Sequence, residues 1–211
     1  MKIIYLIFLI LIIVVQSCGE RTLIRHYYIL EFPATGDSLA TSAIQGEGTC
    51  EIFDSKIPPA YAQQRIAVRQ QSHEISYYQY HYWAMNPSEN LTTLLEHRVQ
   101  LSHIFNSAKS GLLKKIPDYQ ISSQVYKLEA LDSDDIFYAR LEMDLELIDY
   151  KSEKIIVTHR FDRTQILENR DLNLFASALS EIFQEEVDQF ITKIGSYFGH
   201  HTRQIPADKS N

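Results

Sequence analysis

The chain has 211 residues and a formal net charge of −7 at neutral pH, from 27 acidic and 20 basic residues. This acidic balance argues against a nucleic-acid partner, because phosphate backbones are neutralised by lysine and arginine. With 45% hydrophobic and 22% charged residues, the composition is that of an ordinary globular protein, and the length suits one domain.

The N-terminal segment has the organisation of a secretory signal. Lys2 precedes an unbroken apolar run from Ile3 to Val15. A helix of these thirteen residues would span only about 20 Å, which is less than the roughly 30 Å hydrocarbon core of a bilayer. We therefore expect residues 1–17 to be a signal peptide rather than a permanent transmembrane helix.

A cysteine stands at the end of this signal. Val15-Gln16-Ser17-Cys18 resembles a bacterial lipobox, in which the peptide is cut before the cysteine and the cysteine is acylated. Several acyl chains, at roughly 0.8 kcal/mol per buried CH₂, hold a protein stably on a membrane. Residues 18–25 would form the lipidated tether; the alternative is an ordinary secretory signal with an incidental cysteine. Gly19 is not the aspartate that retains lipoproteins at the inner membrane of enteric bacteria, so we expect the periplasmic face of the outer membrane, with inner-membrane anchoring as the alternative.

The first elements of the mature chain are predicted as short strands. His26 to Phe32 is rich in aromatic and branched residues, and Pro33 ends it. Residues 34–48 are predicted as a loop because they are rich in Ser, Thr, Gly and Ala. The next strand is expected around Cys50, whose thiol we interpret as a small buried hydrophobe rather than a reactive group.

The segment 65–87 carries the most specific pattern. Two strand-like runs on either side of a polar break predict a β-hairpin. Alternation within its second run, residues 75–83, places Tyr78, Tyr80 and Tyr82 on one face and Trp83 on the other. Packing within a sheet is the plainer explanation for so many aromatic residues. Asn86-Pro87 then predicts a helix directly after the strand.

Periodic apolar residues predict the elements that follow. Leucine spacings of three and four favour a helix from Ser88 to Phe105. Two weaker strand segments follow at 112–116 and 123–131. Residues 136–148 alternate strictly between apolar and polar side chains, which indicates a strand with one face on the core, and residues 155–161 would return as its partner.

The last helix is expected to begin at Asp171, which can cap it, and to carry a continuous apolar stripe. Residues 200–211 would be a polar tail. The pattern as a whole predicts an α+β fold in a single domain, residues 26–199, with a mixed, largely antiparallel sheet packed by two main helices.

A search for chemistry finds no phosphate-binding loop, dinucleotide fingerprint, zinc-protease motif or nucleophile elbow. Glu142, Asp144 and Glu146 fall on one strand face, but alternation explains them as the solvent face without a metal. His200-His201 is explained as part of a solvated tail. We therefore expect no catalytic residue, no metal and no cofactor.

Two segments resemble the ABC-type transport auxiliary lipoprotein family. The first, Tyr27-Tyr28-Ile29-Leu30, lies just after the lipobox cysteine. The second is the hairpin segment, in which Arg65-Ile66-Ala67-Val68-Arg69 is followed by the tyrosine-rich run from Tyr77 to Ala84 and then by a helix that starts with proline. The resemblance implies a periplasmic sheet-and-helix domain that works with an ABC permease, its ATPase and a substrate-binding protein of the mammalian-cell-entry type, moving lipids between membranes.

In that role the chain would be a non-catalytic docking or assembly subunit, and its oligomeric state, including a homo-oligomer, stays open. The expected partner or lipid contact comprises Tyr78, Tyr80, Tyr82 and Trp83. Two alternatives remain: a stand-alone lipid- or small-molecule-binding lipoprotein, which would show a deep apolar pocket, and a lipoprotein hydrolase.

Overall fold

Three long strands dominate the sheet: β6 (Tyr119–Ser133), β7 (Ile136–Asp149) and β8 (Lys154–Leu167). β6 pairs with β7 and β7 with β8, both antiparallel. They belong to a computed structural model that describes residues 23–32, 48–111, 116–133 and 136–202. Apolar and polar residues alternate along β7, and every apolar residue from Phe137 to Leu147 on its inner face is buried, as predicted.

Five shorter strands complete a mixed sheet: β1 (His26–Tyr28), β2 (Thr49–Ile52), β3 (Arg65–Gln71), β4 (Glu74–Trp83) and β5 (Ser107–Ser110). Their order around β6 is β1-β4-β3-β6-β2-β5. β3 and β4 form the predicted antiparallel hairpin, whereas β1 pairs with β4, and β2 with β5 and β6, in parallel. Most of the paired length is antiparallel because β6, β7 and β8 are long.

Two helices cover this sheet, α2 (Pro87–Leu101) and α3 (Leu172–Thr202). The Asn86 side chain caps α2 by accepting a hydrogen bond from the Ser88 backbone N–H at 2.9 Å. Asp171 caps α3 in the same way, with the Asn173 N–H at 2.7 Å. Both caps agree with the predicted helix starts.

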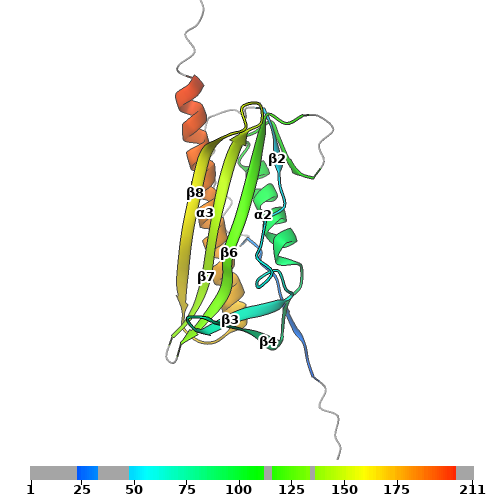
Figure 1. The fold of residues 1–211 in the computed structure, drawn as a ribbon, viewed down its shortest axis with the longest axis vertical. Coiled ribbons are helices and arrows are strands. Elements are labelled where there is room, and N and C mark those ends of the chain that lie inside the picture. The colour runs from blue at the N-terminus through cyan, green and yellow to red at the C-terminus, as the bar shows by residue number, and fades with distance from the viewer. Residues whose placement is uncertain (1–22, 33–47, 112–115, 134–135, 203–211) are drawn as a thin grey trace, which may run out of the picture.

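The core lies between α3 and the inner face of the sheet (Figure 1). Four phenylalanines on α3 are almost completely buried, namely Phe175, Phe183, Phe190 and Phe198. α2 is tied to α3 by Arg98, whose guanidinium donates two hydrogen bonds of 2.7 Å to the Asp188 carboxylate. The predicted apolar stripe is thus confirmed as packing. Neither described helix combines the length and the hydropathy that a membrane crossing requires.

Several boundaries differ from the prediction. The first strand ends at Tyr28 instead of Phe32, and α2 ends at Leu101, although Phe105 is still buried after it. The strand β5 was not predicted, because its sequence Ser-Ala-Lys-Ser shows no apolar alternation. The predicted loop at 34–48 and the strand segment 112–116 fall almost entirely outside the described residues.

The two ends of the elongated molecule carry different elements (Figure 1). β1, β3, β4 and the start of α3 lie at the lower end in that view. β2, the turn between β7 and β8, and the end of α3 lie at the upper end. The chain therefore enters the described domain at the end that holds the tyrosine-rich strand.

Candidate interaction surface

The strand β4 lies between β3 and β1, and its pairing is irregular. Ala67 on β3 faces Tyr77, but Arg65, only two residues earlier, faces Tyr82. Three additional residues of β4 are therefore accommodated between these two pairs, in a local bulge. The predicted period of two does not hold across the bulge, and both Tyr77 and Tyr78 pack against the core.

On its other side, β4 meets β1 in a parallel register that aligns aromatic residues. His26 stands opposite His81, with ring centroids 5.1 Å apart and nearly parallel planes. The Tyr28 hydroxyl lies 2.9 Å from His81 Nδ1, and the Tyr78 ring meets His81 edge-on at 5.6 Å. These four side chains form the His81 cluster.

Burial shifts the pKa values of His81 and Tyr78 in this cluster. Burial, assisted by the neighbouring His26 ring, lowers the pKa of His81, because both disfavour an added positive charge. A neutral imidazole can accept a hydrogen bond from the Tyr28 hydroxyl at Nδ1. Burial also raises the pKa of Tyr78 to about 12, with a smaller contribution from the Asp132 carboxylate. Tyr78 and His81 are therefore uncharged at neutral pH, and the cluster joins β1 to β4.

Tyr80 and Tyr82 differ from Tyr78 in that they are not among the side chains packed against the core. Tyr80 and Tyr82 are half-buried, and the Tyr82 hydroxyl donates to the Gln79 carbonyl at 2.9 Å. The Tyr82 ring centroid lies 5.8 Å from that of Tyr27, and the Arg25 guanidinium lies 5.7 Å from the same ring. These rings present apolar area with a polar tip, the type of surface that proteins and lipid headgroups both contact.

Trp83 does not belong to this surface. Its side chain is only 3% exposed, and its ring packs against Phe175 of α3 at 6.0 Å between centroids. The alternation argument placed Trp83 on the face opposite Tyr82, which agrees with its position in the core. The candidate surface therefore consists of Tyr78, Tyr80 and Tyr82, of which Tyr78 is the least accessible because it also packs against the core.

Cys50 lies in β2 and is fully buried. Burial raises the pKa of its thiol, with a small further contribution from Glu51, while a backbone hydrogen bond from Ile121 opposes the shift. A thiol that stays protonated and has no access to solvent is a poor nucleophile. The interpretation of Cys50 as a small buried hydrophobe is confirmed.

The acidic face of β7 corrects one expectation. Asp144 was expected in water, but it is buried, because the Arg160 guanidinium covers it with two hydrogen bonds of 2.7 Å and the Tyr126 hydroxyl donates a third at 3.1 Å. The hydrogen bonds from Arg160 hold the pKa of Asp144 below its usual value. Glu142 and Glu146 on the same face are half-buried.

Two buried carboxylates were missed by the sequence interpretation. Glu129 on β6 is fully buried, where Tyr61 donates to it at 2.6 Å and Arg69 pairs with it at 2.9 Å. The only signal in the sequence was a charged residue inside an apolar stretch of strand. Its partners lie 60 and 68 positions away, so nothing local identifies them.

The second carboxylate, Glu186 on α3, lies 2.7 Å from His159 Nε2 on β8 and accepts from Arg163 at 2.6 Å. The other ring nitrogen of His159 lies 2.8 Å from the Lys193 ammonium. Both imidazole nitrogens and both carboxylate oxygens of Glu186 are thus occupied within the fold. This arrangement joins the helix to the sheet and leaves neither group aimed at an open site.

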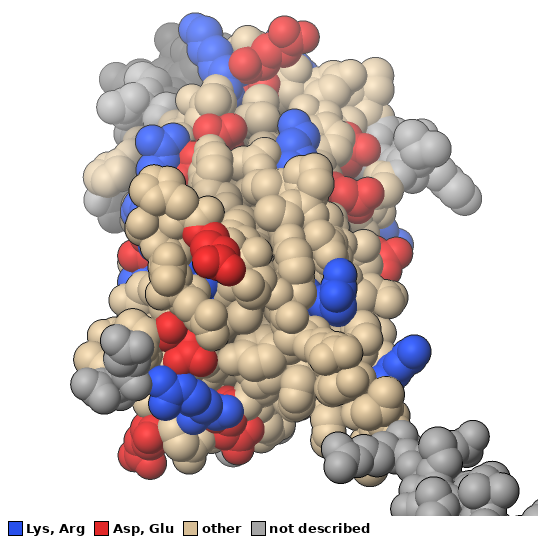
Figure 2. Space-filling view, turned by 60° about the horizontal axis from the view of Figure 1, so that its bottom comes forward, with Lys and Arg blue, Asp and Glu red and all other residues tan. Residues whose placement is uncertain are grey.

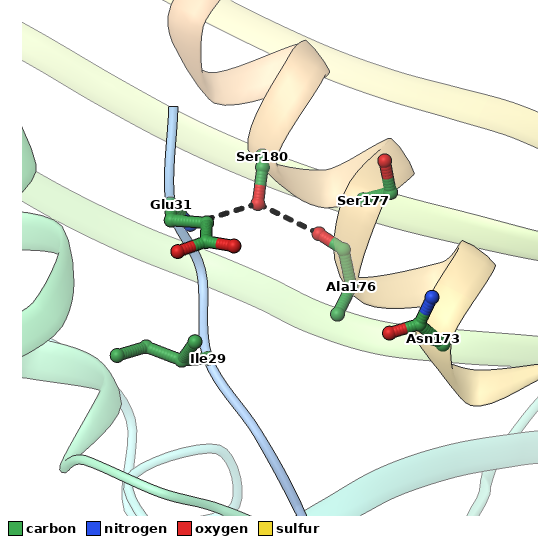
Figure 3. A pocket seen from close by; sticks show the side chains of 6 residues that line it. All are labelled: Ile29, Glu31, Asn173, Ala176, Ser177 and Ser180. Carbon is green, nitrogen blue, oxygen red and sulfur yellow. Dashed lines mark hydrogen bonds between the residues drawn. The ribbon is translucent and has the colours of Figure 1, made fainter. Parts of the chain in front are cut away.

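A small pocket lies between the segment after β1 and the first turns of α3 (Figure 3). It measures about 200 Å³ and is lined by Ile29, Glu31, Asn173, Ala176, Ser177 and Ser180. The Ser180 hydroxyl donates to the Ala176 carbonyl at 2.7 Å and accepts from the Glu31 N–H at 3.2 Å. Ser180 is therefore committed to backbone contacts, and the lining is too polar and too small for an acyl chain.

A wider hollow of about 610 Å³ lies at the other end of the domain. It is bordered by Ile116, Gln120, Ile148, Tyr150, Lys151 and Glu153, and it is open to solvent. Among the described residues, no group of three His, Cys, Asp or Glu side chains is placed to hold a metal ion.

Comparison with known proteins gives both a family and a fold. A family model described as the ABC-type transport auxiliary lipoprotein component matches residues 28–190. A Xanthomonas campestris protein of the family DUF330 superposes with a TM-score of 0.71 at 13% identity, covering 84% of this chain and 99% of its own. An uncharacterised protein superposes with a TM-score of 0.63 at 11% identity, covering 81% and 99%. No curated protein matched the chain by sequence.

Proposed function

Because the chain belongs to the ABC-type transport auxiliary lipoprotein family, we propose that it is a lipid-anchored periplasmic subunit of an ABC-type lipid transport system. In this proposal it docks or assembles a substrate-binding protein of the mammalian-cell-entry type with its permease and ATPase. It performs no chemistry itself, and ATP is hydrolysed by a separate subunit. The observation that carries the proposal is the family match over residues 28–190.

The N-terminal sequence supports the anchor. Cys18 ends a lipobox-like segment and precedes the matched region by ten positions, so acylation at Cys18 would hold the whole domain at a membrane. Gly19 in place of aspartate favours the outer membrane. From there, the domain faces the periplasm, where a substrate-binding protein could reach it.

The packing of the charged groups supports a non-catalytic role. The buried carboxylates Glu129, Asp144 and Glu186 are each held by an arginine and by at least one further side chain. Paired groups of this kind stabilise contacts between elements and are not poised for proton transfer. The lipoprotein hydrolase, which the sequence left open, gains no support from Ser180, because its hydroxyl is held by backbone groups.

Within the described part of the chain, the two pockets above favour a docking subunit over a stand-alone binding protein. A site for a lipid is expected to be a deep apolar cavity. The 200 Å³ pocket is lined by serines, Asn173 and Glu31, and the wider hollow at Tyr150 is open and carries Lys151 and Glu153. The tyrosine surface of Tyr78, Tyr80 and Tyr82 is the proposed contact with a partner or with lipid.

Purification of the tagged protein at native level in mild detergent tests the proposal. Wild type, Tyr80→Ala and Tyr150→Ala would be compared by quantitative mass spectrometry of the co-purifying proteins. The Tyr150 variant is the matched control, because this tyrosine is exposed at the opposite end of the domain. We expect wild type and Tyr150→Ala to recover a mammalian-cell-entry type protein and Tyr80→Ala to lose it. Recovery of bound lipid without any protein partner would instead favour a stand-alone binding protein.

A further inference from the structure

The described domain begins close to the proposed lipid anchor. Leu23 follows Cys18 by five positions, and five extended residues reach at most about 18 Å. With the acyl chains of Cys18 in a bilayer, the start of the domain must lie within that distance of the lipid surface. This step rests on the proposed lipidation of Cys18.

Large apolar side chains are exposed at this end of the domain. Leu23 is 61% exposed, Ile24 68% and Tyr27 58%. Figure 2 shows that uncharged side chains cover most of the middle of this end of the molecule. Tyr27 also packs against the half-buried Tyr82, so strand β1 and strand β4 share one apolar and aromatic surface. Tyrosine and aliphatic side chains together are typical of proteins that rest at a membrane interface.

Two arginines flank this surface, although the chain as a whole is acidic. Arg25 and Arg65 are both exposed. The Arg25 guanidinium lies 5.7 Å from the Tyr82 ring. Arg65 stands opposite Tyr82 in the β3–β4 register, and its guanidinium lies 5.3 Å from the Tyr77 ring. A guanidinium group can bind a phosphate through two hydrogen bonds. The combination of exposed apolar side chains with flanking arginines matches a phospholipid surface, which offers phosphates beside hydrocarbon.

We propose that this surface, made by Leu23, Ile24, Arg25, Tyr27, Arg65 and Tyr82, lies directly on the headgroups of a phospholipid bilayer beside the anchor. The proposal divides the tyrosine surface by function. Tyr82 contacts lipid. Tyr80, which lies two positions before Tyr82 on β4, is left for a protein partner. The turn between β7 and β8 then points away from the membrane.

Depth-dependent fluorescence quenching tests this orientation. The full lipidated protein is placed in vesicles of phosphatidylethanolamine and phosphatidylglycerol, with an environment-sensitive fluorophore on a cysteine introduced by Ile24→Cys, Tyr27→Cys or Lys151→Cys. Cys50 is fully buried and should not take the label. We expect lipids that carry a quencher near the headgroup to quench the labels at 24 and 27 several-fold more than the label at 151. The mass of the purified protein reports acylation of Cys18.

The outcomes separate this inference from the proposed anchor. An unacylated Cys18 would overturn the anchor and the orientation together. Acylated protein in which all three labels are quenched equally would overturn the orientation alone.

A charge reversal provides a second readout in the same vesicles. The double variant Arg25→Glu, Arg65→Glu is expected to lower quenching of the label at 27 several-fold, while the acyl chains keep the protein attached. Lys151→Glu, at the opposite end, is the matched control and should change nothing. Unchanged quenching in the double variant, with a native Trp83 emission spectrum, would contradict the contact between these arginines and the headgroups.

Discussion

The Tyr28 hydroxyl lies 2.9 Å from His81 Nδ1, and this contact joins the short strand β1 to the tyrosine-rich strand β4. β1 has only three residues, and few backbone hydrogen bonds are available to hold it. The His81 cluster therefore helps to fix the entry of the chain into the domain, together with two hydrogen bonds between the Leu30 backbone and the Asn90 side chain.

This contact predicts a pH dependence. Burial lowers the pKa of His81 in the folded protein below its unfolded value of about 6.5, so the unfolded chain binds more protons in the interval between the two values. Stability should therefore be fully present above about pH 6.5 and should fall as the pH drops below it. Urea unfolding of wild type at several pH values, followed by Trp83 emission, measures the slope.

The matched variants are His81→Gln and His97→Gln, the latter at an exposed site on α2. We expect the slope between pH 5 and 7 to flatten in His81→Gln and to persist in His97→Gln. An unchanged slope in His81→Gln would show that His81 is not the group responsible.

A buried ion pair predicts a large loss of stability. Arg69→Gln leaves the fully buried Glu129 carboxylate without its cation, which should lower the free energy of unfolding by about 3–5 kcal/mol. Arg170→Gln removes an arginine from a more exposed pair with Asp132 and should cost about 0–1 kcal/mol. Urea titrations of both variants test the difference. Equal losses would mean that the burial of Glu129 does not determine the cost.

The ion pair between Arg98 of α2 and Asp188 of α3 predicts an intermediate loss of stability. Arg98 is buried, but its partner Asp188 is about one third exposed and can regain water when the arginine is removed. Arg98→Gln should therefore cost about 1–3 kcal/mol, less than Arg69→Gln. A double-mutant cycle with Asp188→Asn isolates the pairwise contribution. Additive effects of the two substitutions would contradict a direct coupling.

Thiol chemistry gives a test of both burial and lipidation. In the mature acylated protein, Cys50 is the only remaining thiol, and it is fully buried. A thiol reagent should therefore find no reactive group in the native protein and one equivalent after unfolding in guanidinium. A reactive equivalent in the native state would indicate an unacylated Cys18 or an accessible Cys50, and the Cys50→Ala variant distinguishes the two.

Local patterns were enough to predict the main architecture. The alternation along residues 136–148, the cap at Asp171 and the apolar stripe after it identify the long strand pair and the helix that covers it. These features depend on neighbouring residues, because the periods of strands and helices are short. The family resemblance also rested on local segments, and the match over residues 28–190 confirms it.

The features that were missed depend on contacts between distant residues. Asp144 is buried because Arg160 and Tyr126 cover it, and neither appears in its local pattern. The bulge in β4 is defined by its pairing with β3, which places Arg65 opposite Tyr82, and the sequence of β4 alone does not predict that pairing. For the same reason, the division of the tyrosines between core and surface could not be read from alternation alone.

Photo-crosslinking from position 80 tests the central claim most directly. A photoreactive phenylalanine analogue replaces Tyr80 in the native-level protein, and the same analogue at Tyr150 serves as the control at the opposite end. After irradiation of intact cells, the account predicts a covalent adduct from position 80 to a mammalian-cell-entry type substrate-binding protein and none from position 150. Adducts from position 80 to lipid alone, or to no protein of an ABC transport system, would contradict the role of this subunit as a docking partner.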